Sequence, residues 1–382
     1  MRLNVGVDAS VVASSSGGTR VYALQLLKEL TELHPEWTFW LYLRRPDEAR
    51  ELSDLASTAN VRVSVVHARP NAWRMQVALP SALKRDGIDV YHSMGFFLPL
   101  RWAGPKVVTV HDLNFIVNAR NWLRAPTLLG WLDLRVQTSF SVRAADQVIT
   151  DSESSRDQIC RLMHLAKDRV VVIPLAADPY FDGTPSKPET DALSQLTSGN
   201  PFVLFVGILS PQKNLLTLMR AYAGSNLPAS RVRLVLAGSD REDYAATLRE
   251  AAESLGIESL VDMPGFVPRP MLRALYRGAL CVVLPSYGEG FGLPLVEGMA
   301  SATPILAADR QAIPEVLGDS GVLFDPDDTE TLAALLSRLG GDQAFRDDLV
   351  QRSAGGRARF SWKKTAEATA AIYEEVLSRR RR

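Results

Sequence analysis

The stretch PSYGEGFGLPLVEGMASATP, residues 285–304, places two glutamates around a glycine-rich turn. Seven residues lie between Glu289 and Glu297. The run CVVLPS just before it, residues 281–286, is apolar and β-branched, which is typical of a buried parallel strand. Pro294 suits the first turn of a helix that begins after the turn. The predicted order of elements is therefore strand, loop and helix.

Three glycines of this loop, Gly288, Gly290 and Gly292, allow backbone amides to approach a bound anion closely. A helix that begins at about Leu293 adds a partial positive charge aimed at the same point, so a phosphate would be well placed there. The two glutamates would flank this phosphate without touching it, because like charges repel. A carboxylate accepts hydrogen bonds from a vicinal diol, so one glutamate on a ribose and one on a sugar predict a nucleotide-sugar pocket.

The length and composition of the chain favour a two-domain globular protein. A chain of 382 residues exceeds what one hydrophobic core usually organises. The formal net charge is zero, which gives no electrostatic reason to expect nucleic-acid binding. The two cysteines, Cys160 and Cys281, fall in different predicted domains, which argues against a disulfide or a zinc site. The chain starts directly with a predicted strand and has no long apolar run, so we expect a cytoplasmic protein.

Apolar strand candidates alternate with helical stretches along the whole chain. The first half contains them at residues 3–9, 38–44, 61–67, 89–93, 106–112, 147–152 and 170–176. The second half contains them at residues 202–207, 232–238, 260–265, 281–286, 304–308 and 321–326. This alternation predicts βαβ units in parallel sheets that are covered on both faces. We therefore predict an α/β protein with two Rossmann-like domains and a cleft between them.

The domain boundaries follow from shifts in composition. The predicted N-terminal domain spans residues 1–180, and the predicted C-terminal domain spans residues 201–360. Residues 181–200 lie in a stretch rich in Pro, Gly, Ser and Thr, which predicts a linker region. Residues 361–382 have helical periodicity and predict a final helix.

Several of these segments resemble family 4 retaining glycosyltransferases. The matching segments of the second half are FVGILSPQKN (205–214), LVLAGSD (234–240), MPGFVP (263–268), the glutamate pair and AIPEVLGDSGVLFDPDD (312–328). In the first half, VTVHDL (108–113) and VITDSESSRDQI (148–159) are also similar to the family. The resemblance implies the GT-B fold, in which two Rossmann-like domains face each other across a cleft and the final helix returns to the first domain. The chain looks most similar to bacterial mannosyltransferase-like members.

The resemblance assigns the donor site to the predicted C-terminal domain. It implies that Glu297 binds the ribose diol and that Glu289 binds hydroxyls of the donor sugar. Lys213 follows a strand and precedes a helix, where an ammonium group is unfavourable unless an anion compensates it, so we expect it to neutralise the donor diphosphate. The other residues expected to bind the donor in this domain are Gly207, Ser210, Phe266, Val267, Gly290, Phe291, Gly292 and Leu293.

The predicted N-terminal domain contributes two further site residues. His111 ends a parallel strand at the edge where ligand sites of open α/β sheets gather, and the family pattern implies that it contacts the donor sugar. Gly18, before an amphipathic helix, either forms an ordinary tight turn or closes over a phosphate. His92 is a weaker candidate for the same cleft, and Arg20 for an acceptor phosphate.

Two features bear on charge in the site. Many family members carry an arginine where this chain has Ile208, so stabilisation of the leaving group would fall to Lys213 and the loop amides. The run DPDD, residues 325–328, superficially suggests a metal site, but Asp328 and Thr329 suit a turn and a helix cap better. The resemblance implies a reaction with no bound divalent ion and no cofactor beyond the nucleotide sugar.

The combined interpretation is a retaining glycosyltransferase that moves a hexose from a nucleoside diphosphate sugar to a glycan or lipid-linked acceptor. GDP-mannose is the first candidate donor, and assembly of bacterial surface polysaccharide is the expected setting. Two alternatives remain open at this point. One is a non-hydrolysing nucleotide-sugar epimerase, and the other is a non-catalytic nucleotide-sugar binding protein.

Two segments raise the question of peripheral contact with a membrane. Residues 95–135 mix aromatic and basic side chains, which suits either a membrane interface or a packed helical hairpin. These side chains are Arg101, Trp102, Lys106, Arg120, Trp122, Arg124 and Trp131. The chain also ends in Arg379–Arg382, which suits either anionic lipid or a solvated helix end.

Overall fold

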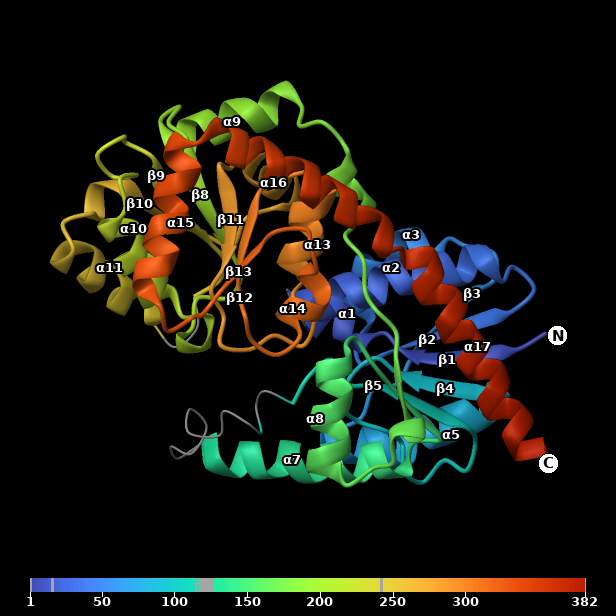
Figure 1. The fold of residues 1–382 in the computed structure, drawn as a ribbon. Coiled ribbons are helices and arrows are strands. Elements are labelled where there is room, and N and C mark those ends of the chain that lie inside the picture. The colour runs from blue at the N-terminus through green and yellow to red at the C-terminus, as the bar shows by residue number, and fades with distance from the viewer. Residues whose placement is uncertain (1, 15–16, 114–115, 117–126, 241–242, 382) are drawn as a thin grey trace. The chain divides into compact units, whose positions relative to one another are not determined.

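The computed structural model describes residues 2–14, 17–113, 116, 127–240 and 243–381. The chain forms two compact units (Figure 1). The first contains Met1–Leu175 and Ser361–Arg382, and the second contains Ala176–Phe360.

The first unit is built on a seven-stranded parallel sheet with the order β3-β2-β1-β4-β5-β6-β7. Its strands are β1 (Asn4–Asp8), β2 (Thr38–Leu43), β3 (Val61–Val65), β4 (Val90–Ser93), β5 (Lys106–Thr109), β6 (Gln147–Thr150) and β7 (Val170–Val172). Its helices are α1 (Ser10–Ser14), α2 (Gly18–Leu33), η1 (Pro46–Leu52), α3 (Ser53–Ala56), α4 (Asn71–Trp73), η2 (Arg74–Ala78), α5 (Leu79–Arg85), α7 (Thr127–Ala144), α8 (Glu153–Met163), η4 (Lys167–Arg169) and α17 (Trp362–Arg381).

The second unit repeats this plan with a six-stranded parallel sheet of order β10-β9-β8-β11-β12-β13. Its strands are β8 (Phe202–Val206), β9 (Arg233–Ala237), β10 (Val261–Gly265), β11 (Cys281–Leu284), β12 (Ile305–Ala308) and β13 (Val322–Phe324). Its helices are η5 (Pro179–Asp182), α9 (Lys187–Thr197), η6 (Pro211–Lys213), α10 (Leu215–Gly224), α11 (Tyr244–Ser254), η7 (Glu258–Leu260), α12 (Arg269–Gly278), α13 (Leu293–Ala300), α14 (Ile313–Leu317), α15 (Thr329–Gly341), α16 (Gln343–Gly356) and η8 (Arg357–Arg359).

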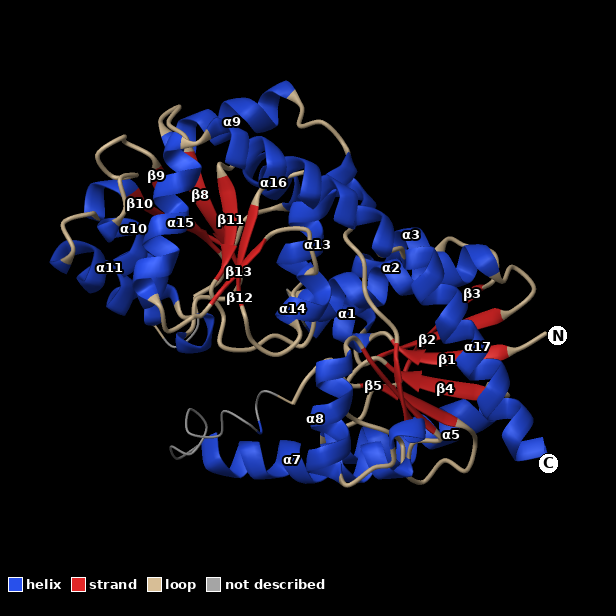
Figure 2. Ribbon diagram, viewed as in Figure 1, coloured by secondary structure: helices blue, strands red, loops and turns tan. Residues whose placement is uncertain are grey.

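The strands expected from the sequence are all present in these two sheets. Every residue of β4, β5, β6, β11 and β12 is buried. Strands β11 and β12 are uninterrupted apolar runs, as expected for buried parallel strands, whereas β4, β5 and β6 each contain two polar residues. Figure 2 shows each sheet enclosed by helices. In both units the strand order reverses beside the first strand, as in doubly wound nucleotide-binding folds. The prediction of two Rossmann-like domains is confirmed.

The predicted linker at residues 181–200 is wrong, because most of this segment is a helix of the second unit. Helix α9 begins with a capping box in which the Ser186 backbone N–H donates to the Glu189 carboxylate at 2.6 Å. Glu189 also pairs with Arg273 of α12 at 2.6 Å. The Ser, Pro and acidic residues that suggested a flexible linker therefore cap and anchor a helix. The first unit ends at Leu175, a few residues before the expected boundary.

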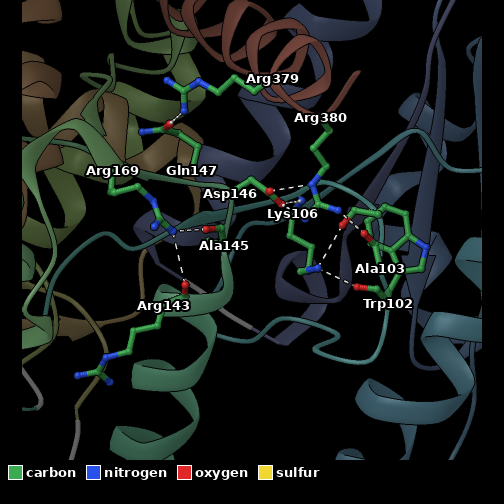
Figure 3. Close-up of polar contacts among 11 residues, drawn as sticks. Trp102, Ala103, Lys106, Arg143, Ala145, Asp146, Gln147, Arg169, Arg379 and Arg380 are labelled. Atoms are coloured by element: carbon green, nitrogen blue, oxygen red, sulfur yellow. Dashed lines mark hydrogen bonds and ion pairs between the residues drawn. The ribbon is translucent and has the colours of Figure 1, made fainter. Parts of the chain in front are cut away.

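The final helix α17 packs in the first unit, as predicted. The Tyr373 hydroxyl lies 2.7 Å from Nδ1 of His92, and the Thr365 hydroxyl donates to the Pro174 carbonyl at 2.7 Å. Figure 3 shows the basic end of the helix. Arg379 donates to the Gln147 side chain at 3.2 Å, and Arg380 pairs with Asp146 at 2.9 Å. These two arginines anchor the end of the helix while their side chains stay 51% and 40% exposed, so they do not form a free basic tail.

The described side chains of residues 95–135 do not support an aromatic membrane anchor. Trp102 and Trp131 are both buried. Lys106 is buried as well, and its ammonium group donates to the Trp102 carbonyl at 2.7 Å. Three other members of the predicted set lie outside the described residues: Arg120, Trp122 and Arg124. Within the described part of the chain, none of the helices has the length and apolarity needed to span a bilayer.

We expect Tyr373→Phe to destabilise the protein by about 1 to 3 kcal/mol, because it leaves a buried His92 ring nitrogen without its partner. Ser378→Ala, an exposed hydroxyl on the same helix, is the control and should change stability by less than about 0.5 kcal/mol. Urea unfolding of both variants measures the difference. Equal stability of the two variants would show that the buried bond contributes nothing.

Candidate active site

A polar cluster of the second unit lies at the point where its strand order reverses. Strands β8 and β11 are neighbours, but the connections that follow them run to opposite sides of the sheet. Ligands of open α/β sheets bind at the carboxyl ends of such strands. Lys213 follows β8, and Glu289 follows β11. The reversal therefore brings together two residues that are 76 positions apart in sequence.

Glu289 is held by two donors on one carboxylate oxygen. The Lys213 ammonium donates to Oε1 at 2.6 Å, and the Ser286 hydroxyl donates to the same atom at 2.7 Å. The side chains of Lys213 and Glu289 are only 19% and 13% exposed, so the pair is shielded from bulk water. Shielding strengthens a charge pair, and the shared contacts restrict both side chains before any ligand arrives. Ser286 was not singled out in the sequence, although it directly precedes the glycine-rich loop.

The two loops that carry this pair are also joined to each other. The Gln212 side-chain amide donates to the Gly288 carbonyl at 3.0 Å, and the Tyr287 backbone N–H donates to the Gln212 carbonyl at 3.0 Å. A Cβ on Gly288 would lie 2.5 Å from the terminal amide of Gln311, so a larger residue there would displace that side chain. These contacts fix the Lys213–Glu289 pair to a rigid frame.

The expected position of Lys213 needs a correction. The sequence places it at the start of a helix, but it is the last residue of the short helix η6. Asn214 then adopts a left-handed conformation with φ of 54°, and α10 begins at Leu215. The negative charge that compensates Lys213 in this structure belongs to Glu289.

The glycine-rich loop leads into α13 as predicted. Gly292 precedes the helix with φ of +91°, a conformation that favours glycine, and Pro294 lies in the first turn. Phe291 is buried, and its ring packs edge-on against Phe360 at 5.6 Å between centroids. Only the backbone of Phe291 is therefore suited to a ligand contact. Leu293 is the first residue of the helix.

Glu297 lies in the second turn of α13 and is almost fully buried. Its Oε2 accepts a hydrogen bond from the Tyr276 hydroxyl at 2.6 Å. Burial raises the pKa of Glu297 to about 7, although the Tyr276 hydrogen bond acts in the opposite direction. The carboxylate therefore gains its charge near neutral pH. Tyr276 is a partner that the sequence did not reveal, because it belongs to α12, 21 positions earlier.

The remaining donor-site candidates of this unit lie beside the cluster or at the sheet edge. Gly207 directly follows β8. Its backbone packs closely against that of Gly238, because a Cβ on Gly238 would lie 1.7 Å from the Gly207 carbonyl oxygen. Ser210 accepts the Lys213 backbone N–H at 3.0 Å. Phe266 follows the edge strand β10 and is 63% exposed, whereas Val267 packs against the core. Gly290 lies in the loop between Glu289 and Phe291.

The first unit holds a second polar cluster around His111. His111 lies two residues beyond β5, and its Nδ1 is 2.7 Å from Oδ2 of Asp151, which directly follows the neighbouring strand β6. Tyr22 of α2 packs against the imidazole ring edge-on, with 4.8 Å between centroids. Burial by itself lowers the pKa of His111, but the charge and hydrogen bond of Asp151 outweigh it and raise the pKa above its usual value.

Asp151 is the functional candidate that sequence reasoning missed in this unit. Its signal was available, because it is an acidic residue at the carboxyl end of the strand beside the one that leads to His111. Parallel strands bring such positions to the same sheet edge.

His92 is not a site residue but a structural one. Its ring lies between the Thr109 hydroxyl at 2.8 Å and the Tyr373 hydroxyl at 2.7 Å, and it has no exposed surface. Burial lowers the pKa of His92 to about 3, so the ring is neutral. The weaker sequence interpretation of His92 as a ligand contact is therefore wrong.

Two other candidates of the first unit have simple structural positions. Gly18 is the first residue of α2, and Gly17 occupies the position before it. Arg20 donates to the Val12 carbonyl at 2.6 Å and pairs with Glu51 at 2.5 Å. The charge of Arg20 is thus already balanced within the unit.

The acidic run at residues 325–328 has capping and pairing roles. Asp328 accepts the Thr331 backbone N–H at 2.9 Å and caps α15, as predicted. Asp325 pairs with Arg310 at 2.9 Å. Across the described residues, no group of three or more His, Cys, Asp or Glu side chains has an arrangement that could hold a metal ion.

Comparison with known proteins adds the family context. A family model described as glycosyl transferases group 1 matches residues 186–355, and one described as Glycosyltransferase Family 4 matches residues 16–180. The O-antigen chain mannosyltransferase B of Escherichia coli is 28% identical over 315 residues, which cover 81% of this chain and 78% of the relative. The D-inositol 3-phosphate glycosyltransferase of Nocardia farcinica (strain IFM 10152) is 30% identical over 306 residues, which cover 76% of this chain and 67% of the relative.

Solved structures show the same architecture. Sucrose-phosphate synthase from Thermosynechococcus elongatus matches with a TM-score of 0.78 over 99% of this chain and 100% of that chain, at 20% sequence identity. At this identity the likeness concerns the fold alone. Together with the two parallel-sheet units, it confirms the GT-B fold expected from the sequence.

The raised pKa of Glu297 predicts an unusual dependence of stability on pH. The folded state holds the proton more tightly than the unfolded chain, whose pKa is near 4.5, so the stability from this group is complete below that value and is lost as pH rises to about 7. Glu297→Gln removes this loss. We compare the free energy of unfolding of the variant with that of the native protein at each pH. This difference should shift in favour of the variant by about 2 to 3 kcal/mol between about pH 5 and about pH 8.

Thermal unfolding at the two pH values measures this effect. Glu253→Gln, at an exposed position of α11, is the matched control for removal of a glutamate charge. If Glu297→Gln and Glu253→Gln respond to pH in the same way, burial does not govern the protonation of Glu297.

Proposed function

Because this chain belongs to the family 4 glycosyltransferases, we propose that it transfers a mannosyl group from GDP-mannose to a glycan or lipid-linked acceptor with retention of configuration. The observation that carries the proposal is the Lys213–Glu289–Ser286 cluster, which lies at the strand reversal of the second unit beside a glycine-rich helix start. The Escherichia coli relative is named as an O-antigen chain mannosyltransferase, which supports mannose as the sugar and a surface polysaccharide as the setting.

The chemistry of the second unit fits each part of such a donor. Lys213 and the backbone amides at the start of α13 supply positive charge for the diphosphate. Glu289 accepts hydrogen bonds from hydroxyls of the sugar, and Glu297 accepts them from the ribose diol. Lys213 also offsets the repulsion between the Glu289 carboxylate and the diphosphate, because it already contacts that carboxylate.

In the proposed reaction the bond between the anomeric carbon and the diphosphate oxygen breaks, and the acceptor oxygen bonds to the same face of that carbon. The acceptor proton passes to the leaving diphosphate, so no separate base is required. Charge stabilisation of the leaving diphosphate is then the main catalytic contribution. We assign this contribution to Lys213 and the loop amides rather than to a divalent ion, and His111 to a contact with the donor sugar.

The family assignment bears on the two alternatives left open by the sequence. A non-hydrolysing epimerase is a different class of enzyme from the glycosyltransferases to which the chain belongs. A protein that only binds nucleotide sugars would not need the reactive set, yet Lys213, Glu289 and His111 are all present. The Nocardia farcinica relative is named for an inositol phosphate acceptor, so D-inositol 3-phosphate is the second acceptor to test.

A thermal-shift screen tests the donor. We expect GDP to raise the unfolding temperature more than UDP, ADP or TDP, since a ligand at 100 times its Kd stabilises by about 2.7 kcal/mol. GDP release from GDP-mannose, measured with a mannan fragment, a lipid-linked mannoside and D-inositol 3-phosphate, then identifies the acceptor class. NMR of the product reports the anomeric configuration, and transfer in EDTA tests the assignment of charge stabilisation to protein groups. Failure of every sugar donor would reject the proposal.

The two glutamates should separate chemistry from nucleotide binding. Glu289→Gln should abolish mannosyl transfer while leaving the Kd for GDP nearly unchanged, because its expected ligand is the sugar. Glu297→Gln should weaken GDP binding roughly 10- to 100-fold at about pH 8, since hydrogen bonds to a charged group contribute about 1.5 to 3 kcal/mol. Calorimetry and a GDP-release assay measure the two effects, with Glu253→Gln as the control. Full transfer by both variants would contradict the site assignment.

A further inference from the structure

The pair formed by His111 and Asp151 contains two buried polar atoms that lack partners among the described residues. Nδ1 of His111 is satisfied by Oδ2 of Asp151 at 2.7 Å. Its Nε2 and the other carboxylate oxygen, Oδ1 of Asp151, are buried and have no hydrogen-bond partner among the described residues. Leaving such a group unsatisfied costs about 1 to 3 kcal/mol, so each unpaired atom in a folded protein needs an explanation.

We propose that Asp151 is a positioning residue that accepts the Nδ1 proton of His111 and thereby leaves Nε2 as the ring atom that meets a hydroxyl group of the donor sugar. This inference rests on the proposed function for the identity of the ligand. The orientation of His111 rests on the geometry alone. An ionised carboxylate can accept hydrogen bonds but cannot donate them. The short contact between Asp151 and Nδ1 therefore requires the proton to lie on that nitrogen.

The ring is restrained from a second direction as well. Tyr22 packs edge-on against the imidazole at an interplanar angle of 84°. The Tyr22 hydroxyl is itself fixed, because it lies 2.8 Å from the Thr109 hydroxyl. The backbone of His111 is held too, since its carbonyl accepts the Ser155 hydroxyl at 3.1 Å. Because Nδ1, the ring and the backbone of His111 all have partners, Nε2 is held in one orientation.

Asp151 differs from the other titratable groups around His111. Asp112 follows His111 in the chain and adds a weaker electrostatic effect of the same sign. Tyr22 and His92 are neutral at physiological pH, since burial raises the pKa of the first and lowers that of the second. On α8, Glu153 is paired with Arg156. Asp151 is therefore the charge that faces the ring directly.

Removing the charge of Asp151 has a predictable consequence for protonation. Burial lowers the pKa of His111, and Asp151 is the main influence that raises it. In Asp151→Asn the burial remains and the compensating charge is gone, so the pKa of His111 should fall. The amide of Asn can also donate to Nδ1, which would move the proton to Nε2. The tautomer change would remove the acceptor that the sugar hydroxyl meets in the native pair, whereas the lower pKa would extend the neutral form of the ring to lower pH.

The test compares Asp151→Asn with Asp157→Asn. Asp157 is an exposed aspartate of α8 that pairs with Lys167 at 2.7 Å, so its substitution removes the same charge away from the ring. Long-range ¹H–¹⁵N NMR of histidine-labelled protein, with His111→Asn to assign the signal, gives the proton position and the pKa of His111. We expect Nδ1–H in the native protein, a lower pKa in Asp151→Asn and no change in Asp157→Asn. The acidic limb of kcat/KM for mannosyl transfer should move to lower pH with the NMR titration.

The outcomes separate the inference from the proposed function. If His111 titrates identically in the native protein, Asp151→Asn and Asp157→Asn, Asp151 does not position the ring and the inference fails. If Asp151→Asn does not fold, the native protein alone decides, because a proton on Nε2 rather than Nδ1 overturns the inference. If no nucleotide sugar is used as a donor while the NMR result is as expected, the orientation of His111 stands and the proposed function fails.

Discussion

Parallel strands end at a common edge, and this constraint gathers the polar residues of each unit. In the second unit the common edge brings Lys213, which follows β8, next to Glu289, which follows β11, although the two residues are far apart in sequence. In the first unit it joins His111 after β5 to Asp151 after β6. In open α/β sheets of this kind, ligands bind at the carboxyl ends of the strands, beside the point where the strand order reverses. The juxtaposition of these polar residues is thus a consequence of sheet order.

Burial disfavours the charged form of every ionisable group, but the resulting pKa shifts differ because the partners of these groups differ. His92 contacts only hydroxyl groups, so desolvation prevails and the ring stays neutral. His111 faces a carboxylate, and the charge of Asp151 more than offsets the same desolvation. Glu297 receives one neutral donor, Tyr276, which is too weak to offset burial, and its pKa rises to about 7. The presence or absence of one nearby charge therefore decides whether desolvation or the partner sets the direction of the pKa shift of a buried group.

Sequence reasoning recovered the elements whose signal is local. The strands were predictable because buried parallel strands are continuous apolar runs, and the caps at Pro294 and Asp328 follow from backbone chemistry within a few residues. Long-range partners were not predictable in this way. Tyr276 and Ser286 are recognised only by their contacts with Glu297 and Glu289. Asp151 is recognised by its place at the end of the strand beside the one that leads to His111, which requires the strand order as well as the sequence. The error at residues 181–200 arose because Ser, Pro and Glu serve both flexible linkers and capping boxes, and only packing against Arg273 distinguishes the two.

The replacement of a common family arginine by Ile208 places a particular demand on the glycine-rich loop. Ile208 carries no charge. The ammonium of Lys213 is already paired with the carboxylate of Glu289, so Lys213 and Glu289 together present little net positive charge to a diphosphate. The backbone amides at the start of α13 must then contribute more of the stabilisation in the proposed reaction. Their direction depends on Gly292, whose φ of +91° turns the chain into the helix. A side chain at that position would strain the turn and redirect the amides. A single backbone conformation thus links the local fold of residues 285–304 to the charge that the leaving group would meet.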